Sequence, residues 1–302
     1  PNDGGGVYLS AGTAAIADAQ IWGNTADADG GGVYVFNGKA TMSNTRVVSN
    51  AADNEGGGVY VSEAGSTLVA NGGEFGNNTA GSEGGGVFVK LGTATIADAD
   101  IISNSANENS GGGVCVSSGR VTVANTRVEG NTADDEGGGV SIWSGAAGMT
   151  NTQIVSNSAN TGAGVYVDEG TVTMTNTQVV SNTADDIGGG VCVESGTVAM
   201  TNTQITGNSG WDGGGLDIEE GTATMENTQI VRNTADYDGG GVFILVGTAT
   251  MTNTEIARNT ANQSGGGVSI QSGRAAMTNT QIVRNTADHY CGGVYVYAGT
   301  AT

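Results

Sequence analysis

Carboxylates are the side chains of this sequence best placed for chemistry, because they recur directly before a glycine-rich triplet that appears about every 26 residues. Hard cations such as Ca²⁺ bind several carboxylate and carbonyl oxygens, so calcium is the one cofactor that the pattern suggests. The spacing matches neither an EF-hand nor a calcium-binding nonapeptide repeat. A solvated acidic surface is the alternative interpretation. The candidate metal ligands at these positions are Asp27, Asp29, Asp134, Asp135, Glu136, Asp185, Asp186, Asp236, Asp238 and Asp288.

Groups that could act with these acids in catalysis are scarce. The sequence has a single histidine, His289, and its two lysines, Lys39 and Lys90, lie far apart along the chain. General acid–base catalysis and sugar hydrolysis both need titratable groups that converge on one point. We therefore predict no catalytic residue and a protein that is not an enzyme. A polysaccharide-acting enzyme is kept as the second alternative.

Aromatic side chains form another candidate surface toward the N-terminus. One apolar residue separates each of several triplets from an aromatic ring, and alternation would place these rings on the outside. An exposed aromatic row can be a contact surface for a partner or a glycan, whereas a row of stacked rings can also be purely structural. The predicted contact residues are Tyr8, Tyr34, Tyr60 and Phe88, with Phe36 beside them.

Threonines recur at outward positions of the repeat and suggest an ice-binding face. One column holds Thr150, Thr175, Thr201, Thr252 and Thr278, and a neighbouring column holds Thr173, Thr224 and Thr250. Glu226 interrupts the first column, while Ala199 and Ala276 interrupt the second. Threonine is also a common residue of exposed strands. An ice-binding or calcium-stabilised module is therefore the first alternative function.

Composition excludes several classes of protein. The 302 residues include 55 Gly and one Pro, without the three-residue glycine period of collagen. The net charge is -21, from 30 acidic and nine basic residues, which argues against nucleic acid as a partner. No apolar run approaches the roughly 20 residues of a membrane-spanning helix, so we expect no membrane insertion.

An internal repeat dominates the sequence. The spacing between successive triplets is 25 to 28 residues, and the apolar residues that follow the triplets are Val7, Val33, Val59, Val87, Val114, Val140, Val165, Val191, Leu216, Val242, Val268 and Val294. Within each unit, runs such as VYV and TATMT alternate with period two and are rich in β-branched residues, which indicates strands. Units of this kind bury their apolar faces only by stacking. We predict an all-β chain: a right-handed, single-stranded parallel β-helix of about eleven to twelve coils, with three short strands per coil.

Columns of equivalent residues follow from stacking. Three columns are predicted to point inward. Their members include Val33 and Val59, Met174 and Met200, and Ile205, each with the equivalent residues of the other coils. Two asparagine columns mark corners, where Asn tolerates left-handed backbone and can bond to the next copy of itself. One column is Asn151, Asn176, Asn202, Asn227, Asn253 and Asn279; the other is Asn24, Asn50, Asn78, Asn104, Asn131, Asn157, Asn182, Asn208, Asn233, Asn259 and Asn285.

The repeat resembles the polymorphic outer membrane protein repeats of bacterial surface proteins. The first motif of that family, a glycine pair before aliphatic residues, stands here as Gly57-Gly58-Val59, and its second, FxxN, stands as Phe75-Gly76-Asn77-Asn78 and Ile154-Val155-Ser156-Asn157. Here Gly usually replaces the family's Ala, and Ile or Val replaces the Phe in nearly every copy. The resemblance implies a secreted, surface-exposed β-helical passenger and names no ligand.

We therefore expect one β-helix domain over residues 1–302 that serves as a non-enzymatic, extracellular or cell-surface structural or adhesive rod. Neither end of the sequence has an atypical repeat that would cap a solenoid. The expected partners are a second copy by head-to-tail stacking, or flanking repeats of a longer chain, and a host or matrix glycan or protein. No nucleic acid is expected.

Overall fold

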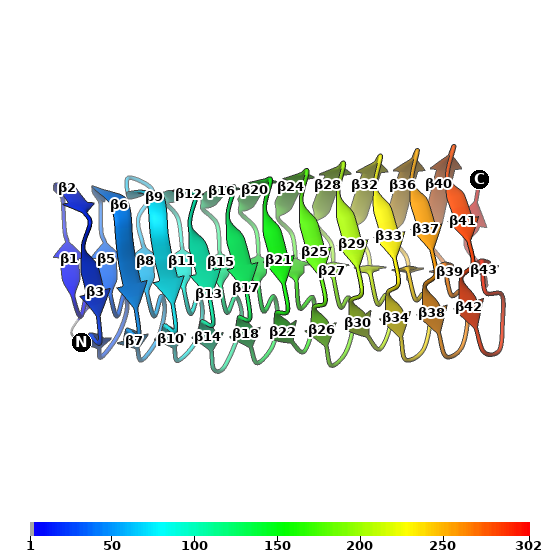
Figure 1. Cartoon of the computed structure of the whole chain (residues 1–302), viewed down its shortest axis with the longest axis horizontal. Coiled ribbons are helices and arrows are strands. Elements are labelled where there is room, and N and C mark those ends of the chain that lie inside the picture. Colours follow the sequence, from blue (N-terminus) through cyan, green and yellow to red (C-terminus); the bar gives the residue numbers. More distant parts are fainter. Residues whose placement is uncertain (1–2) are drawn as a thin grey trace. The chain divides into compact units, whose positions relative to one another are not determined.

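The computed structural model describes residues 3–302 and divides them into two compact units, residues 3–153 and Ile154–Thr302. Every regular element in this range is a β-strand. Both units repeat one coil of about 26 residues, and each complete coil contributes strands to three parallel sheets, which we name A, B and C (Figure 1). The prediction of an all-β parallel solenoid is confirmed.

Sheet A takes the Val-x-Val segment after each triplet. Its strands in the first unit are β1 (Val7–Leu9), β5 (Val33–Val35), β8 (Val59–Val61), β11 (Val87–Val89), β15 (Val114–Val116) and β19 (Val140–Ile142). Those in the second unit are β23 (Val165–Val167), β27 (Val191–Val193), β31 (Leu216–Ile218), β35 (Val242–Ile244), β39 (Val268–Ile270) and β43 (Val294–Val296).

Sheet B takes the two longer segments of each coil. In the first unit they are β2 (Gly12–Ala17), β3 (Gln20–Trp22), β6 (Gly38–Val48), β9 (Thr67–Gly76), β12 (Thr93–Ala97), β13 (Asp100–Ile102), β16 (Arg120–Ala124), β17 (Arg127–Glu129) and β20 (Ala146–Thr150), followed by β21 (Gln153–Val155). In the second unit they are β24 (Thr171–Thr175), β25 (Gln178–Val180), β28 (Thr197–Thr201), β29 (Gln204–Thr206), β32 (Thr222–Glu226), β33 (Gln229–Val231), β36 (Thr248–Thr252), β37 (Glu255–Ala257), β40 (Arg274–Thr278), β41 (Gln281–Val283) and β44 (Thr300–Ala301).

Sheet C consists of two-residue strands at what the sequence predicted to be a corner. They are β4 (Thr25–Ala26), β7 (Ala51–Ala52), β10 (Thr79–Ala80), β14 (Ser105–Ala106) and β18 (Thr132–Ala133) in the first unit. In the second unit they are β22 (Ser158–Ala159), β26 (Thr183–Ala184), β30 (Ser209–Gly210), β34 (Thr234–Ala235), β38 (Thr260–Ala261) and β42 (Thr286–Ala287). Most coils thus carry four short strands where three were predicted.

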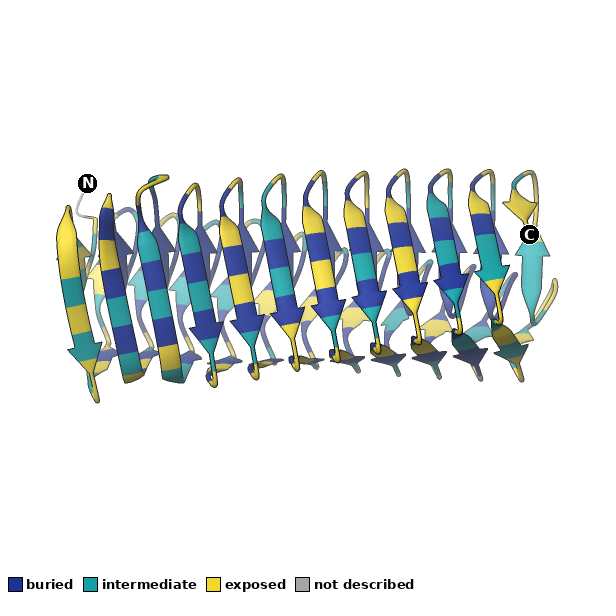
Figure 2. Ribbon diagram, turned by 90° about the horizontal axis from the view of Figure 1, so that it is seen from above, coloured by how far each residue is buried: buried dark blue, intermediate teal, exposed yellow. Residues whose placement is uncertain are grey.

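Identical residues stack in register, and this stacking builds the core. Val33 pairs with Val59, and Met174 pairs with Met200. These side chains are buried, as predicted. Along sheet B the inward and outward residues alternate, which Figure 2 shows as dark blue and yellow bands on its foremost strands.

The bend in sheet B explains the first asparagine column. Asn227 and Asn253 have φ of 50° and 51°, and each separates two strands of one coil. Asparagine adopts this left-handed conformation more readily than most residues, because its short side chain bonds locally. The prediction of left-handed corners is therefore confirmed for this column.

The second asparagine column is a buried ladder. The Asn50 backbone N–H and its side-chain Nδ2 both donate to Oδ1 of Asn78, each at 3.0 Å, and Nδ2 also donates to the Ile21 carbonyl. Asn208 and Asn233 repeat this arrangement in the second unit. Because each buried amide is satisfied by the adjacent coil, the ladder joins successive coils without leaving unpaired polar groups.

The glycine triplet is needed for a turn and a close backbone contact. Gly30 has φ of 69°, and a Cβ at Gly31 would lie 2.2 Å from the Ala51 carbonyl oxygen of the next coil. Only glycine avoids both penalties.

Candidate functional site

The acidic corners fold back over the outer face of sheet A. Gly56, the first glycine of its triplet, turns the chain so that Glu55 lies within hydrogen-bonding reach of Tyr60. Lys90 Nζ lies 3.4 Å from Glu55 Oε2 and 5.9 Å from the centre of the Tyr60 ring. These contacts cover the outer face of sheet A, and so all three residues of strand β8 are buried.

The predicted exposed aromatic row is wrong in its exposure and right in its stacking. Tyr34, Tyr60 and Phe88 are 6%, 2% and 1% exposed, whereas Tyr8 and Phe36 are 49% and 37% exposed. The ring centres of Tyr34 and Tyr60 lie 4.8 Å apart, and those of Tyr60 and Phe88 lie 5.4 Å apart. Strands covered on both faces lose the alternation on which the prediction relied, because the outward residue is also buried. The row is a second core layer, and only its two exposed members remain contact candidates.

The predicted calcium ligands separate into an outer and an inner set. The outer set is exposed and comprises Asp27, Asp134, Asp135, Asp185, Asp186, Asp236 and Asp288. The inner set comprises Asp29, Glu136 and Asp238, which accept hydrogen bonds within the protein. Asp238, for example, accepts bonds from the Ser264 backbone N–H at 2.8 Å and from Gln271 Nε2 at 3.1 Å.

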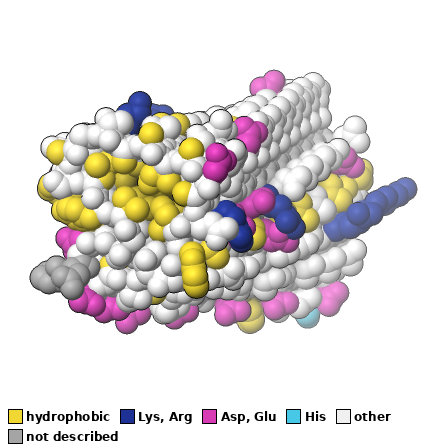
Figure 3. All heavy atoms as spheres, turned by 60° about the vertical axis from the view of Figure 1, so that its left-hand side comes forward, with side chains coloured by type: hydrophobic (Ala, Val, Ile, Leu, Met, Phe, Trp, Pro, Cys, Tyr) yellow, Lys and Arg dark blue, Asp and Glu magenta, His cyan; other side chains and the backbone are white. Residues whose placement is uncertain are grey.

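The outer and inner acids do not converge on a common point. Acidic side chains are visible along the lower edge of the face drawn in Figure 3. Among residues 3–302, no three His, Cys, Asp or Glu side chains are grouped as a metal site would require. Calcium binding therefore stays a prediction, which a melting curve with and without chelator tests.

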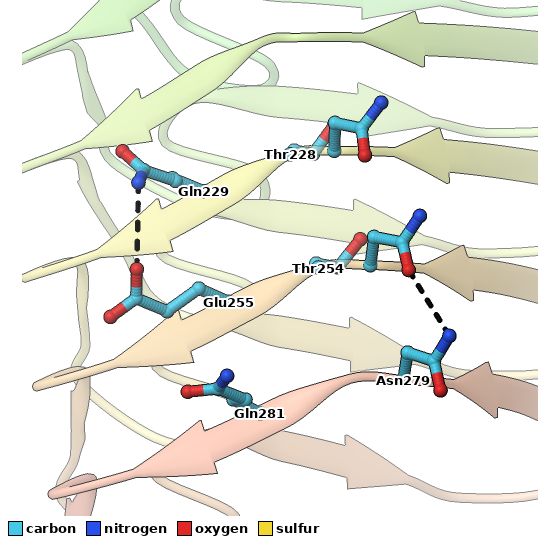
Figure 4. A pocket seen from close by; sticks show the side chains of 8 residues that line it. Thr228, Gln229, Thr254, Glu255, Asn279 and Gln281 are labelled. Carbon is cyan, nitrogen blue, oxygen red and sulfur yellow. Dashed lines mark hydrogen bonds between the residues drawn. The ribbon is translucent and has the colours of Figure 1, made fainter.

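A shallow polar groove follows the bend of sheet B. In the second unit Thr228 and Thr254 form its floor, where each hydroxyl donates to the backbone carbonyl two residues before it. Its walls are polar: Asn279 Nδ2 donates to Asn253 Oδ1 at 3.3 Å, and Gln229 Nε2 donates to Glu255 Oε2 at 3.5 Å (Figure 4). The first unit has an equivalent groove at Asp98, Asp100, Asn125, Thr126 and Arg127. The groove presents repeated amide, hydroxyl and carboxylate groups suited to hydrogen bonding.

The threonine columns lie on the outer face of sheet B, as predicted. In the second unit Thr175 stacks on Thr201, and Thr224 stacks on Thr250. Ala199 and Glu226 interrupt the columns in the same register. The face is therefore outward and regular but not continuous.

The coil at residues 208–232, which we call the Asp217 coil, departs most from the repeat. Asp217 occupies the outward position of strand β31 that Cys192 and Phe243 hold in the adjacent coils. It is fully buried, and no donor among residues 3–302 reaches either carboxylate oxygen. The Glu219 carboxyl lies within hydrogen-bonding reach, but two ionised carboxylates have no proton to share.

The carboxyl groups around Asp217 resist ionisation. Burial, followed by the negative charges of Asp238 and Asp186, raises the pKa of Asp212 from 3.8 to about 7, although its bond to the Asp238 backbone opposes the shift. Burial and then the charge of Glu219 raise the pKa of Asp217 well above its usual range. Burial is also the largest cause of the raised pKa of Glu219. Carboxyl groups are thus concentrated here in an environment that opposes the ionisation of all of them together.

Two aromatic residues directly precede acidic residues of this cluster in the chain, Trp211 before Asp212 and Tyr237 before Asp238. Trp211 and Tyr237 are 49% and 41% exposed, and their rings stack with centres 5.7 Å apart and an angle of 7° between planes. They belong to a row two residues before each triplet, which we call the tip row: Asp186, Trp211, Tyr237, Gln263 and His289. Backbone bonds connect the row, from Tyr237 N–H to the Trp211 carbonyl and from Gln263 N–H to the Tyr237 carbonyl.

The sequence interpretation missed Asp212, Asp217, Glu219 and Trp211. The available signal was local: in this coil an aspartate stands at a position otherwise held by Tyr, Phe, Cys or Ser, and a tryptophan stands at a tip otherwise mostly polar. Attention to the repeated pattern obscured these single departures from it.

Comparison with known proteins gives a family and no individual relative. A family model described as a right-handed β-helix region matches residues 139–302. No curated protein and no solved structure matches the chain. Within residues 3–302, no helix combines the length and apolar character that crossing a bilayer would take.

Proposed function

The chain belongs to the right-handed β-helix family, and on that premise we propose that it is a non-enzymatic structural or adhesive scaffold that acts outside the cell. The observation that carries this proposal is the repetition of polar rows from coil to coil. The groove in the second unit repeats its amides at Asn227, Asn253 and Asn279 and its hydroxyls at Thr228 and Thr254. A surface of this kind favours many weak contacts with an extended partner over reaction at one point.

The buried asparagine ladder supports the structural part of the role. Each rung, such as Asn182 to Asn208, satisfies a backbone N–H and a side-chain amide in the adjacent coil at 2.9 Å. Charge-free ladders of this type strengthen stacked parallel strands. A scaffold that resists local opening would keep its polar rows in register for a partner.

The extracellular location rests on the surface charge and on the resemblance to bacterial surface repeats. A net charge of -21 keeps the chain soluble and repels anionic polymers and membranes. A passenger of the polymorphic outer membrane protein type, partnered by matrix protein or glycan or by further copies of itself, is the finer form of the proposal.

The test measures binding and turnover with the same purified chain. Retained chain is quantified on beads that carry neutral polysaccharides or matrix proteins. New reducing ends and unsaturated sugars are measured with neutral and with acidic polysaccharides in solution. We expect retention without product. The groove variant with Gln229→Ala and Gln281→Ala should be retained less than Asn262→Ala, which changes an exposed residue outside the groove. Product formed in proportion to the protein concentration would refute the proposal.

Ice binding is the second candidate, and the observation that favours it is the register of threonines on sheet B. Thr222 pairs with Thr248, and Thr224 pairs with Thr250, so that four hydroxyls lie in a regular patch. Thermal hysteresis at high protein concentration would support this function, and its absence would remove it.

A further inference from the structure

The tip row and the Asp217 coil together form the strongest local departure from the repeat. Residues 185–195, 209–221 and 234–247 carry nine Asp and Glu residues and no Lys or Arg. The ion pairs Arg46–Glu74, Lys90–Glu55 and Arg127–Glu129 all lie in the first unit. The second unit therefore presents a stretch of acidic charge that its own basic residues do not neutralise.

The surroundings of Asp217 oppose its ionised form. The carboxyl group is fully buried, no donor within residues 3–302 reaches it, and the charges that oppose its ionisation are those of Glu219, Asp212 and Asp186. Buried carboxylates are normally paired or hydrogen-bonded, because removing an unpaired charge from water is costly. A positive charge brought to the surface above this group would lower the free energy of every carboxylate around it.

The exposed rings of Trp211 and Tyr237 form a surface on which a cation can bind. Tyr237 stacks on Trp211 from one side, and Asp186 precedes Trp211 in the tip row, so the free face of the indole lies toward Asp186. Indole is the aromatic group that attracts cations most strongly, and Arg is the cation found most often on such a face. A guanidinium over Trp211 would contact the ring and pair with a carboxylate at once.

We propose that Trp211, Tyr237 and the surrounding carboxylates form a binding site for a basic protein segment, with an Arg or Lys side chain stacked on the indole. Charge complementarity is what favours this partner over a neutral glycan, because a sugar would use the rings and leave the carboxylates uncompensated. The site does not depend on the scaffold role proposed above, since it would bind the same segment whatever the rest of the surface does.

The test uses a fluorescently labelled hexa-arginine peptide and the full chain, with anisotropy as the readout. We expect saturable binding that Trp211→Ala weakens about three- to ten-fold, the range typical of a cation–π contact. Asp186→Asn should weaken it by a smaller factor. Raising the salt from about 0.15 M to about 1 M should also weaken binding, because the Debye length falls from about 8 Å to about 3 Å.

Trp22→Ala is the matched control, since Trp22 is 70% exposed but lies beside Arg46 in the first unit. It should leave the affinity unchanged, and circular dichroism checks that each variant folds. Equal affinity in the wild type and in both Trp211→Ala and Tyr237→Ala would overturn the proposal. It would also be overturned if a neutral oligosaccharide bound with the same dependence on Trp211 while hexa-arginine did not bind. Either result leaves the bead assay for the scaffold role unaffected.

Discussion

Replacing Asp217 by Asn should stabilise the protein at alkaline pH and have little effect at acidic pH. The substitution Asp217→Asn keeps the shape of the side chain, removes the buried charge and supplies an N–H donor toward Glu219. A buried polar group without a partner costs about 1–3 kcal/mol, and more when it is charged. We expect the free energy of unfolding at pH 8 to rise by about 2 kcal/mol.

The pH dependence follows from the direction of the pKa shifts. A carboxyl whose pKa is raised by folding contributes stability that is fully present below its unfolded pKa and is lost as the pH rises through its folded pKa. For Asp212 this window runs from 3.8 to about 7. The shift corresponds to about 4 kcal/mol at about 1.4 kcal/mol per pKa unit, which we halve to about 2 kcal/mol because solvent partly screens this carboxyl. The wild type should therefore be less stable at pH 8 than at pH 5.

Urea unfolding at pH 5 and pH 8, followed by tryptophan fluorescence and by circular dichroism, measures both effects. Asp217→Asn should raise the midpoint at pH 8 and reduce the difference between the two pH values. Asp185→Asn is the matched control, because it removes the same charge from an exposed position of the second unit. An equal gain at both pH values, an equal gain from Asp185→Asn, or a loss of stability at pH 8 would refute the reasoning.

Three further predictions concern the repeat itself. In a urea titration, Asn182→Ala should lower the free energy of unfolding by about 3 kcal/mol, because it removes the partner of the Ile154 carbonyl and of the Asn157 amides. The control Asn262→Ala changes an exposed residue and should lower it little. Gly31→Ala should prevent folding or greatly lower the melting temperature, since its Cβ would lie 2.2 Å from a carbonyl oxygen, whereas Gly148→Ala meets nothing within 4 Å and should be neutral or stabilising by up to about 1 kcal/mol. Calcium added to chelator-treated protein should raise the melting temperature if the acidic corners bind it, and an unchanged melting curve would remove calcium from consideration.

The repeat made the core predictable. Residues such as Val33, Met174 and Ile205 recur at one position of each coil, so one correct assignment of inward and outward faces fixed all the others. The asparagine ladder followed from the same stacking, because a residue placed above its own copy can bond to that copy. The second bond of each amide, such as that from Asn50 to the Ile21 carbonyl, was not predicted. The two-residue strands of sheet C were missed, since segments such as Thr25–Ala26 are too short to show any period.

The prediction that the aromatic row is exposed was wrong for a reason that the repeat could not reveal. Alternation predicts which side of a strand a residue occupies, but not whether another segment covers that side. Tyr60 does point away from the core, and it is buried because Glu55 and Lys90 lie over it. Nothing in the spacing of Glu55 distinguishes a corner that extends into solvent from one that folds back.

This second buried layer is also what makes Asp217 informative. At its position the other coils hold aromatic rings, cysteines and serines, all of which tolerate burial better than a carboxylate does. A buried group that costs stability and has no donor within residues 3–302 is typical of functional sites, where local strain is offset elsewhere. Asp217→Asn should therefore raise stability at pH 8 and, at the same pH, weaken hexa-arginine binding, because a cation bound at Trp211 favours the ionised form of Asp217. A variant that gains stability and keeps its full affinity for the peptide would show that Asp217 has no part in the binding site.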